Sequence, residues 1–258
     1  MKPIMDAHIH LDMYKQKEQE TILQEMESYK VEALIAVSYS LLSCKRNLEL
    51  HKMDPRIKVA YGHHPEQDLP SRKNQEELER FLLSNSGTMV AIGEIGLPYY
   101  NMQKTNPSLS LDPYVHFLER MIVIASQIKK PVVLHAVYDH APIVCDLLEK
   151  HNSKQAHFHW FKGDAKTVER MIENGYHVSF TPDCLYEPEI QELIQRYPIE
   201  QMMVETDGPW GFKGPFANQM THPKMIHAVI EQIATLKKLP VDDVYQQIYL
   251  NTKMFYAL

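Results

Sequence analysis

The feature that most constrains the fold of this chain is an alternation of short apolar runs with longer amphipathic stretches. The apolar runs have the length and the β-branched content of buried strands. Eight of them lie at residues 4–9, 33–38, 57–61, 89–95, 132–136, 156–160, 176–180 and 202–205. Helices are predicted where apolar residues recur at helical spacing among charges. The clearest cover residues 16–30, 74–85 and 113–129, and further helices are predicted over residues 164–174, 223–237 and 242–257.

Strands that alternate with helices form a parallel sheet in which each helix crosses back over the sheet. Eight such units in 258 residues match the count of a closed (β/α)8 barrel. An open, doubly wound sheet is the alternative, but no Gly-x-Gly-x-x-Gly turn follows the first apolar run. Because no composition break marks a linker, we predict that residues 1–258 form a single α/β domain, a TIM-type barrel.

Composition limits the classes of partner and compartment. The net charge of −6 provides no broadly basic surface for wrapping duplex DNA. The three cysteines are far apart and none lies in a Cys-x-x-Cys pair, which favours free thiols in a reducing compartment. The chain has neither a signal-like start nor an apolar run of about 18 residues. We therefore expect a cytoplasmic protein with no membrane span, and we expect a monomer.

His8 and His10 are the first candidate site residues, at the end of the first predicted strand. Alternate residues of a strand share a face, so both imidazoles point the same way. Two imidazoles on one face make half of a divalent metal site. The alternative is a pair of core histidines held by hydrogen bonds.

Polar side chains also follow most of the other predicted strands. They are His63 and His64, Glu94, His135, His159, and Glu205 with Asp207. In a barrel of this type, functional side chains gather at the carboxyl ends of the strands. Imidazoles bind a borderline cation without adding charge, and a carboxylate can bridge two cations. Two ions about 3.5–4 Å apart lower the pKa of a water molecule and hold the oxygens of an electrophile. The pattern therefore predicts a metal-dependent hydrolase.

The ordered motifs carry a family resemblance. They are His8-x-His10, Gly62-x-His64-Pro65, Gly93-Glu94-x-Gly96-Leu97, His135, His159-x-Phe161-x-Gly163, Glu205-Thr206-Asp207-x-Pro209 and Asn251-x-x-x-Phe255. Together they resemble the TatD family of metal-dependent hydrolases, which belongs to the amidohydrolase-like (β/α)8 superfamily. The resemblance covers nearly the whole chain.

The resemblance implies two divalent ions, which would be zinc, manganese or magnesium, with nickel or iron also compatible. Their ligands divide into His8, His10 and Asp207 for the first ion, His135 and His159 for the second, and Glu94 as the bridge. Asp207 would also polarise the attacking water, and His64 would contact the scissile group. Glu205, two residues before Asp207, shares its face and is expected to support a ligand or a water.

The same resemblance implies that the substrate is DNA, because members are described as deoxyribonucleases and several as 3′-to-5′ exonucleases. We therefore expect phosphodiester hydrolysis from single-stranded ends. One departure weakens this expectation. The family has His-x-Arg where this chain has His135-Ala136-Val137, and the missing arginine fork would suit a phosphate. Lys104, Lys162, Lys213 or Arg72 could replace it from the loops.

Several alternatives stay open. The same chemistry could act on a small ester, lactone, amide or phosphoester, or the barrel could bind metal without catalysis. His157 has the same strand parity as His159 and could be a ligand in its place. The aromatic residues of the predicted rim loops could stack a base or only pack. These are Tyr99, Tyr100, Trp160, Trp210 and Phe212.

Overall fold

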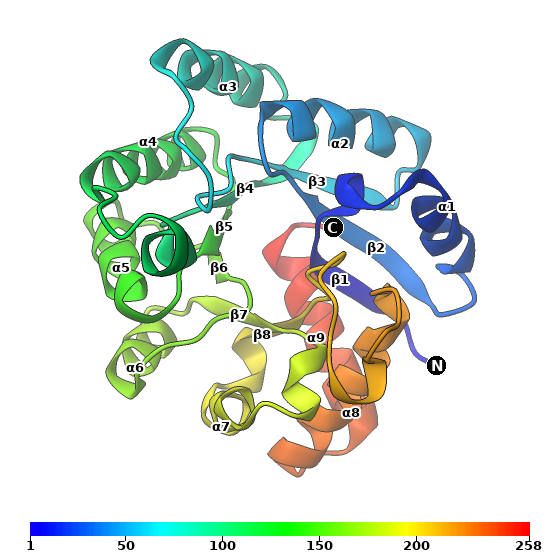
Figure 1. Cartoon of the computed structure of the whole chain (residues 1–258). Coiled ribbons are helices and arrows are strands. Elements are labelled where there is room, and N and C mark those ends of the chain that lie inside the picture. The colour runs from blue at the N-terminus through cyan, green and yellow to red at the C-terminus, as the bar shows by residue number, and fades with distance from the viewer.

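The strands of this protein form one parallel sheet in chain order, seen end-on at the centre of Figure 1. The computed structural model describes residues 1–258, apart from the side chain of Thr105. The strands are β1 (Ile4–Ile9), β2 (Val31–Val37), β3 (Ile57–Tyr61), β4 (Met89–Gly96), β5 (Val132–His135), β6 (Ala156–Phe158), β7 (His177–Phe180) and β8 (Met202–Val204).

Backbone hydrogen bonds close this sheet into a barrel between β1 and the segment after β8. The Asp207 N–H donates to the His8 carbonyl at 2.9 Å, and the His10 N–H donates to the Gly208 carbonyl at 2.8 Å. The buried Asp6 carboxylate strengthens the seam by accepting the Thr206 N–H at 3.0 Å. The prediction of a (β/α)8 barrel is therefore confirmed.

The helices surround the strands on the outside (Figure 1). They are α1 (Gln16–Glu25), α2 (Leu41–Met53), α3 (Arg72–Ser84), α4 (Asp112–Gln127), α5 (Ala141–Lys150), α6 (Ala165–Glu173), α7 (Pro188–Arg196), α8 (Ile226–Lys237) and α9 (Val241–Phe255). Their lengths give each parallel strand the crossover that it needs. None of these described helices is both long enough and apolar enough to cross a bilayer.

Local capping explains where some predicted helices begin and end. The Asp164 carboxylate accepts the backbone N–H groups of Lys166 and Thr167, so it caps α6. Gly175 follows the helix at φ +75°, a conformation that glycine adopts without strain. In contrast, α1 ends at Glu25 rather than at residue 30, and Lys30 takes a left-handed turn at φ 55° into β2.

The core has two layers. The larger layer lies between the outer face of the strands and the helices. The inner layer fills the barrel with mostly small or β-branched side chains, namely Ala7, Ile35, Val37, Ala60, Ala91, Val133 and Met203. Phe255 and Tyr256, at the end of α9, pack against this inner layer. One end of the barrel is therefore plugged by the chain's own C-terminus, and the opposite end remains for polar side chains.

Four of the predicted strands end one or two residues earlier than expected, and the early ends of β6 and β8 matter for the site. β6 stops at Phe158 and β8 at Val204, so His159, Glu205 and Asp207 lie just beyond the strands. The backbone turns sharply there, with positive φ angles of 37° at Trp160 and 47° at Asp207. These turns redirect the side chains toward the open mouth of the barrel.

Candidate metal centre

A first group of ligand atoms forms where β1 and the segment after β8 meet β4. His8 Nε2 lies 3.2 Å from Glu94 Oε2 and 3.2 Å from Asp207 Oδ1. His10 Nε2 lies 3.3 Å from the same glutamate oxygen and 3.4 Å from the same aspartate oxygen. We call His8, His10, Asp207 and Glu94 Oε2 the first ligand group.

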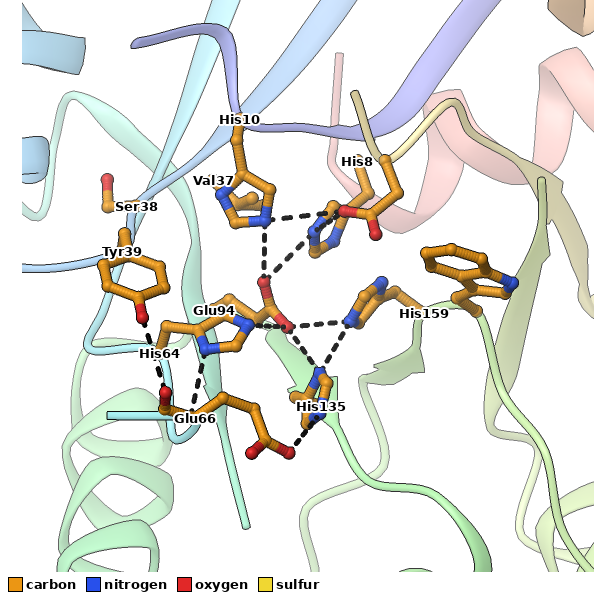
Figure 2. Close-up of polar contacts among 12 residues, drawn as sticks. His8, His10, Val37, Ser38, Tyr39, His64, Glu66, Glu94, His135 and His159 are labelled. Atoms are coloured by element: carbon orange, nitrogen blue, oxygen red, sulfur yellow. Dashed lines mark hydrogen bonds and ion pairs between the residues drawn. The ribbon is translucent and has the colours of Figure 1, made fainter. Parts of the chain in front are cut away.

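A second group lies on the other side of the same glutamate. Glu94 Oε1 is 2.7 Å from His159 Nε2 and 3.0 Å from His135 Nδ1, and these two nitrogens are 3.3 Å apart. We call His135, His159 and Glu94 Oε1 the second ligand group. Figure 2 shows the Glu94 carboxylate at the centre of the cluster, with His8 and His10 on one side and His135 and His159 on the other.

Burial leaves polar atoms of the first ligand group without hydrogen bonds. His8 Nε2, Glu94 Oε2 and Asp207 Oδ1 are all buried and have no partner among the described residues. Burying a polar atom without a hydrogen bond costs free energy of folding, so three such atoms that face one another indicate a partner bound between them. A divalent cation would satisfy all three, because imidazole nitrogen and carboxylate oxygen are its ordinary ligands. The residues therefore fit the metal that the motifs predict.

The charges of the cluster keep its carboxylates ionised. Burial raises the pKa of Glu94, but the surrounding histidines, His159 first among them, outweigh burial and hold that pKa well below its usual range. Burial likewise raises the pKa of Asp207, and its close contacts with His10 and His8 outweigh burial and lower that pKa overall. Two ionised carboxylates in one buried cluster attract cations strongly, whether protons or metal ions.

His64 is placed as a donor beside the second ligand group. Its Nδ1 accepts the backbone N–H of Glu66 at 3.1 Å, and burial lowers its pKa to about 4, so the ring is neutral. The single ring proton is then on Nε2, which lies 3.2 Å from Glu94 Oε1. Nε2 is near enough to His10 and Glu94 to join a metal site, but a protonated nitrogen cannot coordinate. The preceding His63 faces away and contacts the Asp68 carbonyl at 3.1 Å.

Glu205 lies behind His159, on the side away from Glu94. Its Oε1 is 3.6 Å from His159 Nδ1 and accepts the Trp160 N–H at 2.8 Å. Its Oε2 accepts the Ser179 hydroxyl at 2.5 Å. At 3.6 Å this contact is longer than a hydrogen bond, so the Glu205 carboxylate acts on His159 Nδ1 through its charge.

A buried hydrogen-bond chain continues from Glu205 into the barrel. Because Ser179 gives its one proton to Glu205, the His157 Nε2 at 2.5 Å must donate to the serine oxygen. His157 Nδ1 then accepts the Tyr256 hydroxyl at 2.8 Å, the shorter of two contacts of this hydroxyl. We call Glu205, Ser179, His157 and Tyr256 the interior chain. Both nitrogens of His157 are used in it, so the structure does not place His157 among the ligand groups.

Glu66 is a site residue that the sequence reasoning missed. Its Oε1 lies 3.1 Å from His135 Nε2, and its carboxylate accepts the backbone N–H groups of Tyr100 at 2.8 Å and Asn101 at 2.5 Å. Burial raises the pKa of Glu66, but its hydrogen bond with His135 leads a set of contacts that lower the pKa overall. An acidic residue two positions after His64 was the available signal, and a loop has no periodicity that would show where it points.

A cavity of about 590 Å³ opens onto the cluster at the mouth of the barrel. Its lining residues come from the loops after most of the strands. They are Tyr39, His64, Glu66, Tyr100, Lys104, His135, Val137, His159, Trp160, Lys162, Asp207 and Trp210. Metal ligands, aromatic rings and two lysines therefore share one cavity.

The other candidate loop residues lie outside this lining. Lys213 and Arg72 are not part of it, and Arg72 instead pairs with Glu76 at 3.5 Å on the surface of α3. Phe212 is buried against Trp160, with ring centres 6.0 Å apart. Tyr99 packs on Tyr138 at 5.0 Å. Phe212 and Tyr99 therefore pack against other rings and do not line the cavity.

Comparison with known proteins agrees with the motifs. The family model described as TatD related DNase matches residues 5–257. The chain belongs to the TatD family. A TatD-family relative from Haemophilus influenzae, described as an uncharacterized metal-dependent hydrolase, is 39% identical over 256 residues and spans 99% of this chain and 100% of the relative. Another metal-dependent hydrolase, from Methanocaldococcus jannaschii, is 26% identical over 259 residues, with 98% and 96% covered.

Solved structures of the TatD family share the fold. The YJJV homologue of TatD from Escherichia coli superposes with a TM-score of 0.88 at 22% identity, over 99% of this chain and 98% of that one. A TatD-family hydrolase from Entamoeba histolytica gives a TM-score of 0.84 at 18% identity, with the same coverage of 99% and 98%. The protein is thus a metal-dependent hydrolase of the TatD family with a TIM-type barrel.

Proposed function

We propose that this hydrolase cleaves phosphodiester bonds at the end of a single DNA strand, with one divalent ion in each ligand group. The position of Glu94 carries the proposal, because Oε2 faces the first group and Oε1 faces the second. One carboxylate shared by two sets of donors suits a bridge between two cations. The description of the matching family as a DNase supports DNA as the substrate.

The ligand groups and their neighbours divide the chemical work. Bound ions would supply Lewis acidity at a phosphoryl oxygen and lower the pKa of a water molecule. Asp207 lines the cavity and accepts the proton of the attacking water. His64 lines the same cavity, and its Nε2–H donates to an oxygen of the scissile group.

The cavity walls suit a strand end. Lys104 Nζ lies 5.2 Å from the ring centre of Tyr100, and Lys162 Nζ lies 5.9 Å from that of Trp160. These two lysines provide cationic contacts for phosphates next to the scissile one, in place of the missing arginine. The exposed ring of Trp210 offers a face on which a base can stack. A cavity of about 590 Å³ accommodates a terminal nucleotide and not an intact duplex.

The direct test is an exonuclease assay on metal-stripped protein reloaded with Mn²⁺, Mg²⁺ or Zn²⁺. We expect stepwise shortening of 5′-labelled single-stranded DNA that depends on the metal and is lost in Asp207→Asn. Two ions per chain should be found by elemental analysis. Intact DNA after incubation with fully loaded protein would contradict the proposal.

A charge-matched pair of variants tests the lysine contacts. Lys162→Gln should raise KM for DNA by about 10-fold, as expected for loss of one charged phosphate contact. Lys213→Gln removes the same charge outside the cavity lining and should leave KM nearly unchanged. Equal effects of the two substitutions would assign the result to net charge instead.

The aromatic side chains that line the cavity also favour a second candidate, hydrolysis of a small ester, lactone, amide or phosphoester. Bis(p-nitrophenyl) phosphate and p-nitrophenyl acetate separate the two reactions. Metal-dependent cleavage of either one by protein that leaves DNA intact would favour this candidate. If Asp207→Asn altered no activity at all, a barrel that binds metal without catalysis would be the better description.

A further inference from the structure

Glu66 contacts two histidines of the site and the loop after β4. It lies in the loop after β3, with its side chain largely buried at 15% exposure. Its backbone N–H contacts His64, while its carboxylate contacts His135 and two backbone amides of the loop after β4. One residue therefore joins two histidines of the site to a wall of the cavity, as Figure 2 shows for the histidines.

Glu66 contacts the two histidines in opposite ways: its carboxylate accepts from His135, and its backbone N–H donates to His64. A carboxylate can only accept, so Glu66, 3.1 Å away, places a proton on His135 Nε2. His135 Nδ1 lies 3.0 Å from Glu94 Oε1, so it is the nitrogen whose lone pair would face a cation in the second ligand group. A backbone N–H can only donate, so His64 must be unprotonated on Nδ1, 3.1 Å away, and keep its proton on Nε2. His135 can thus act as a ligand through Nδ1, whereas His64 can act as a hydrogen-bond donor through Nε2.

We propose that Glu66 is a positioning residue that makes His135 a metal ligand through Nδ1 and makes His64 a proton donor through Nε2. The proposal rests on the two-ion function described above. A histidine can act in either role, and here the role depends on whether a carboxylate or an amide occupies the outer nitrogen.

The same carboxylate connects the second ligand group to the cavity wall. It accepts the amides of Tyr100 and Asn101, and Tyr100 and Lys104 from this loop line the cavity. In Glu66→Gln only one oxygen remains to accept from the two amides and His135, so these three donors compete for it. The orientation of His135 and the order of the loop should therefore change in one step.

Glu66→Gln tests the carboxylate while it keeps the backbone contact to His64. We expect the affinity for the more weakly bound of the two Zn²⁺ ions, measured by titration calorimetry, to fall about 10–100-fold. The other ion should bind as in the wild type. Amide hydrogen exchange of Tyr100 and Asn101 should become faster, and the melting temperature of the metal-free protein should change little. The matched control is Glu76→Gln, which removes the same charge from an exposed pair on α3.

The tautomers of His64 and His135 distinguish a positioning role of Glu66 from a general loss of stability, because destabilisation alone would not change which ring nitrogen is protonated. In the Zn²⁺-loaded wild type, long-range ¹H–¹⁵N NMR should show His64 and His135 both protonated on Nε2, with signals assigned from the His64→Asn and His135→Asn variants. In Glu66→Gln the His135 signal should change and the His64 signal should stay. A His135 ring that is protonated on Nδ1 in the wild type would overturn the proposal.

The outcomes separate this proposal from the proposed function. Two ions bound with the same affinities in wild type and Glu66→Gln would contradict the role of Glu66 and leave the two-ion function intact. A single ion in the wild type, weakened by Glu66→Gln, would contradict the two-ion function and support the role of Glu66. A single ion that Glu66→Gln does not affect would contradict both.

Discussion

His159 and His135 occupy equivalent places in the second ligand group, but they are held in different ways. Behind His159 stands Glu205, which is fully buried and continues into the interior chain as far as Tyr256. Behind His135 stands Glu66, which lies on a loop and accepts amides of a second loop. His159 is therefore fixed by the barrel core, whereas His135 is fixed by the walls of the substrate cavity. Changes to the first should affect folding, and changes to the second should affect binding.

Glu94→Gln should have the largest effect, because Glu94 is the residue that both histidines share. An amide cannot offer two anionic oxygens to two groups of donors, so both ions should bind poorly. We expect hydrolytic activity to fall by about 10³-fold or more. Elemental analysis and steady-state rates check this prediction. If the variant kept two ions, the two ligand groups would not meet through Glu94.

Glu205→Ala should break the interior support. Trp160 N–H and the Ser179 hydroxyl would both lose a buried acceptor, which should lower the free energy of unfolding by about 2–4 kcal/mol. Metal affinity should also fall, by about 10–100-fold. Denaturant unfolding of the metal-free protein measures the first effect. If Glu205→Ala were as stable as the wild type, the support of His159 by the barrel core would not contribute to folding, and the contrast with His135 would fail.

Tyr256→Phe probes the far end of the interior chain. His157 Nδ1 would lose its donor inside the barrel, so the free energy of unfolding should fall by about 1–2 kcal/mol. Metal affinity should change much less than in Glu205→Ala, because Glu205 keeps its own partners. Tyr249→Phe, which removes a hydroxyl on the surface of α9, is the control. An equal loss of metal affinity in Tyr256→Phe and Glu205→Ala would instead show that the chain transmits its effect to the site.

His177 should give the smallest effect, at the plugged end of the barrel beside Phe255, with ring centres 4.9 Å apart. Burial lowers its pKa from the ordinary 6.5 to about 4. As the pH falls, His177 is protonated in the unfolded chain before it is protonated in the folded protein. The contribution of neutral His177 to the free energy of unfolding is therefore full above pH 6.5 and decreases as the pH falls toward 4. His177→Gln should reduce that loss by about 1 kcal/mol. Unfolding curves of both proteins at a series of pH values provide the measurement.

Prediction succeeded where the signal was local. The barrel was predictable because the spacing of apolar residues within each segment indicates whether that segment is a buried strand or a half-buried helix. The ligand groups were predictable because strand parity and strand order bring His8, His10 and Glu94 to one end of the barrel. Helix α2 was harder to predict, because its inner face buries the polar Ser43 and Asn47. The Asn47 amide is satisfied by the Val37 carbonyl at 3.0 Å, a partner that helical periodicity cannot reveal.

The choice between His157 and His159 shows the limit of strand parity. Both face inward, and only the folded barrel decides that one meets Ser179 and Tyr256 while the other meets Glu94. The early end of β6 contributes, since it turns His159 out of the strand toward the mouth.

The order of residues along this chain was therefore enough to specify an eight-unit barrel with imidazoles and carboxylates at one end. It was not enough to say which nitrogen of each histidine faces the centre, or that Glu66 takes part. Those properties depend on which donor or acceptor from a distant loop reaches each ring. Hydrogen bonds between segments far apart in the chain leave no periodic pattern along it, so they exist only once the tertiary structure has formed.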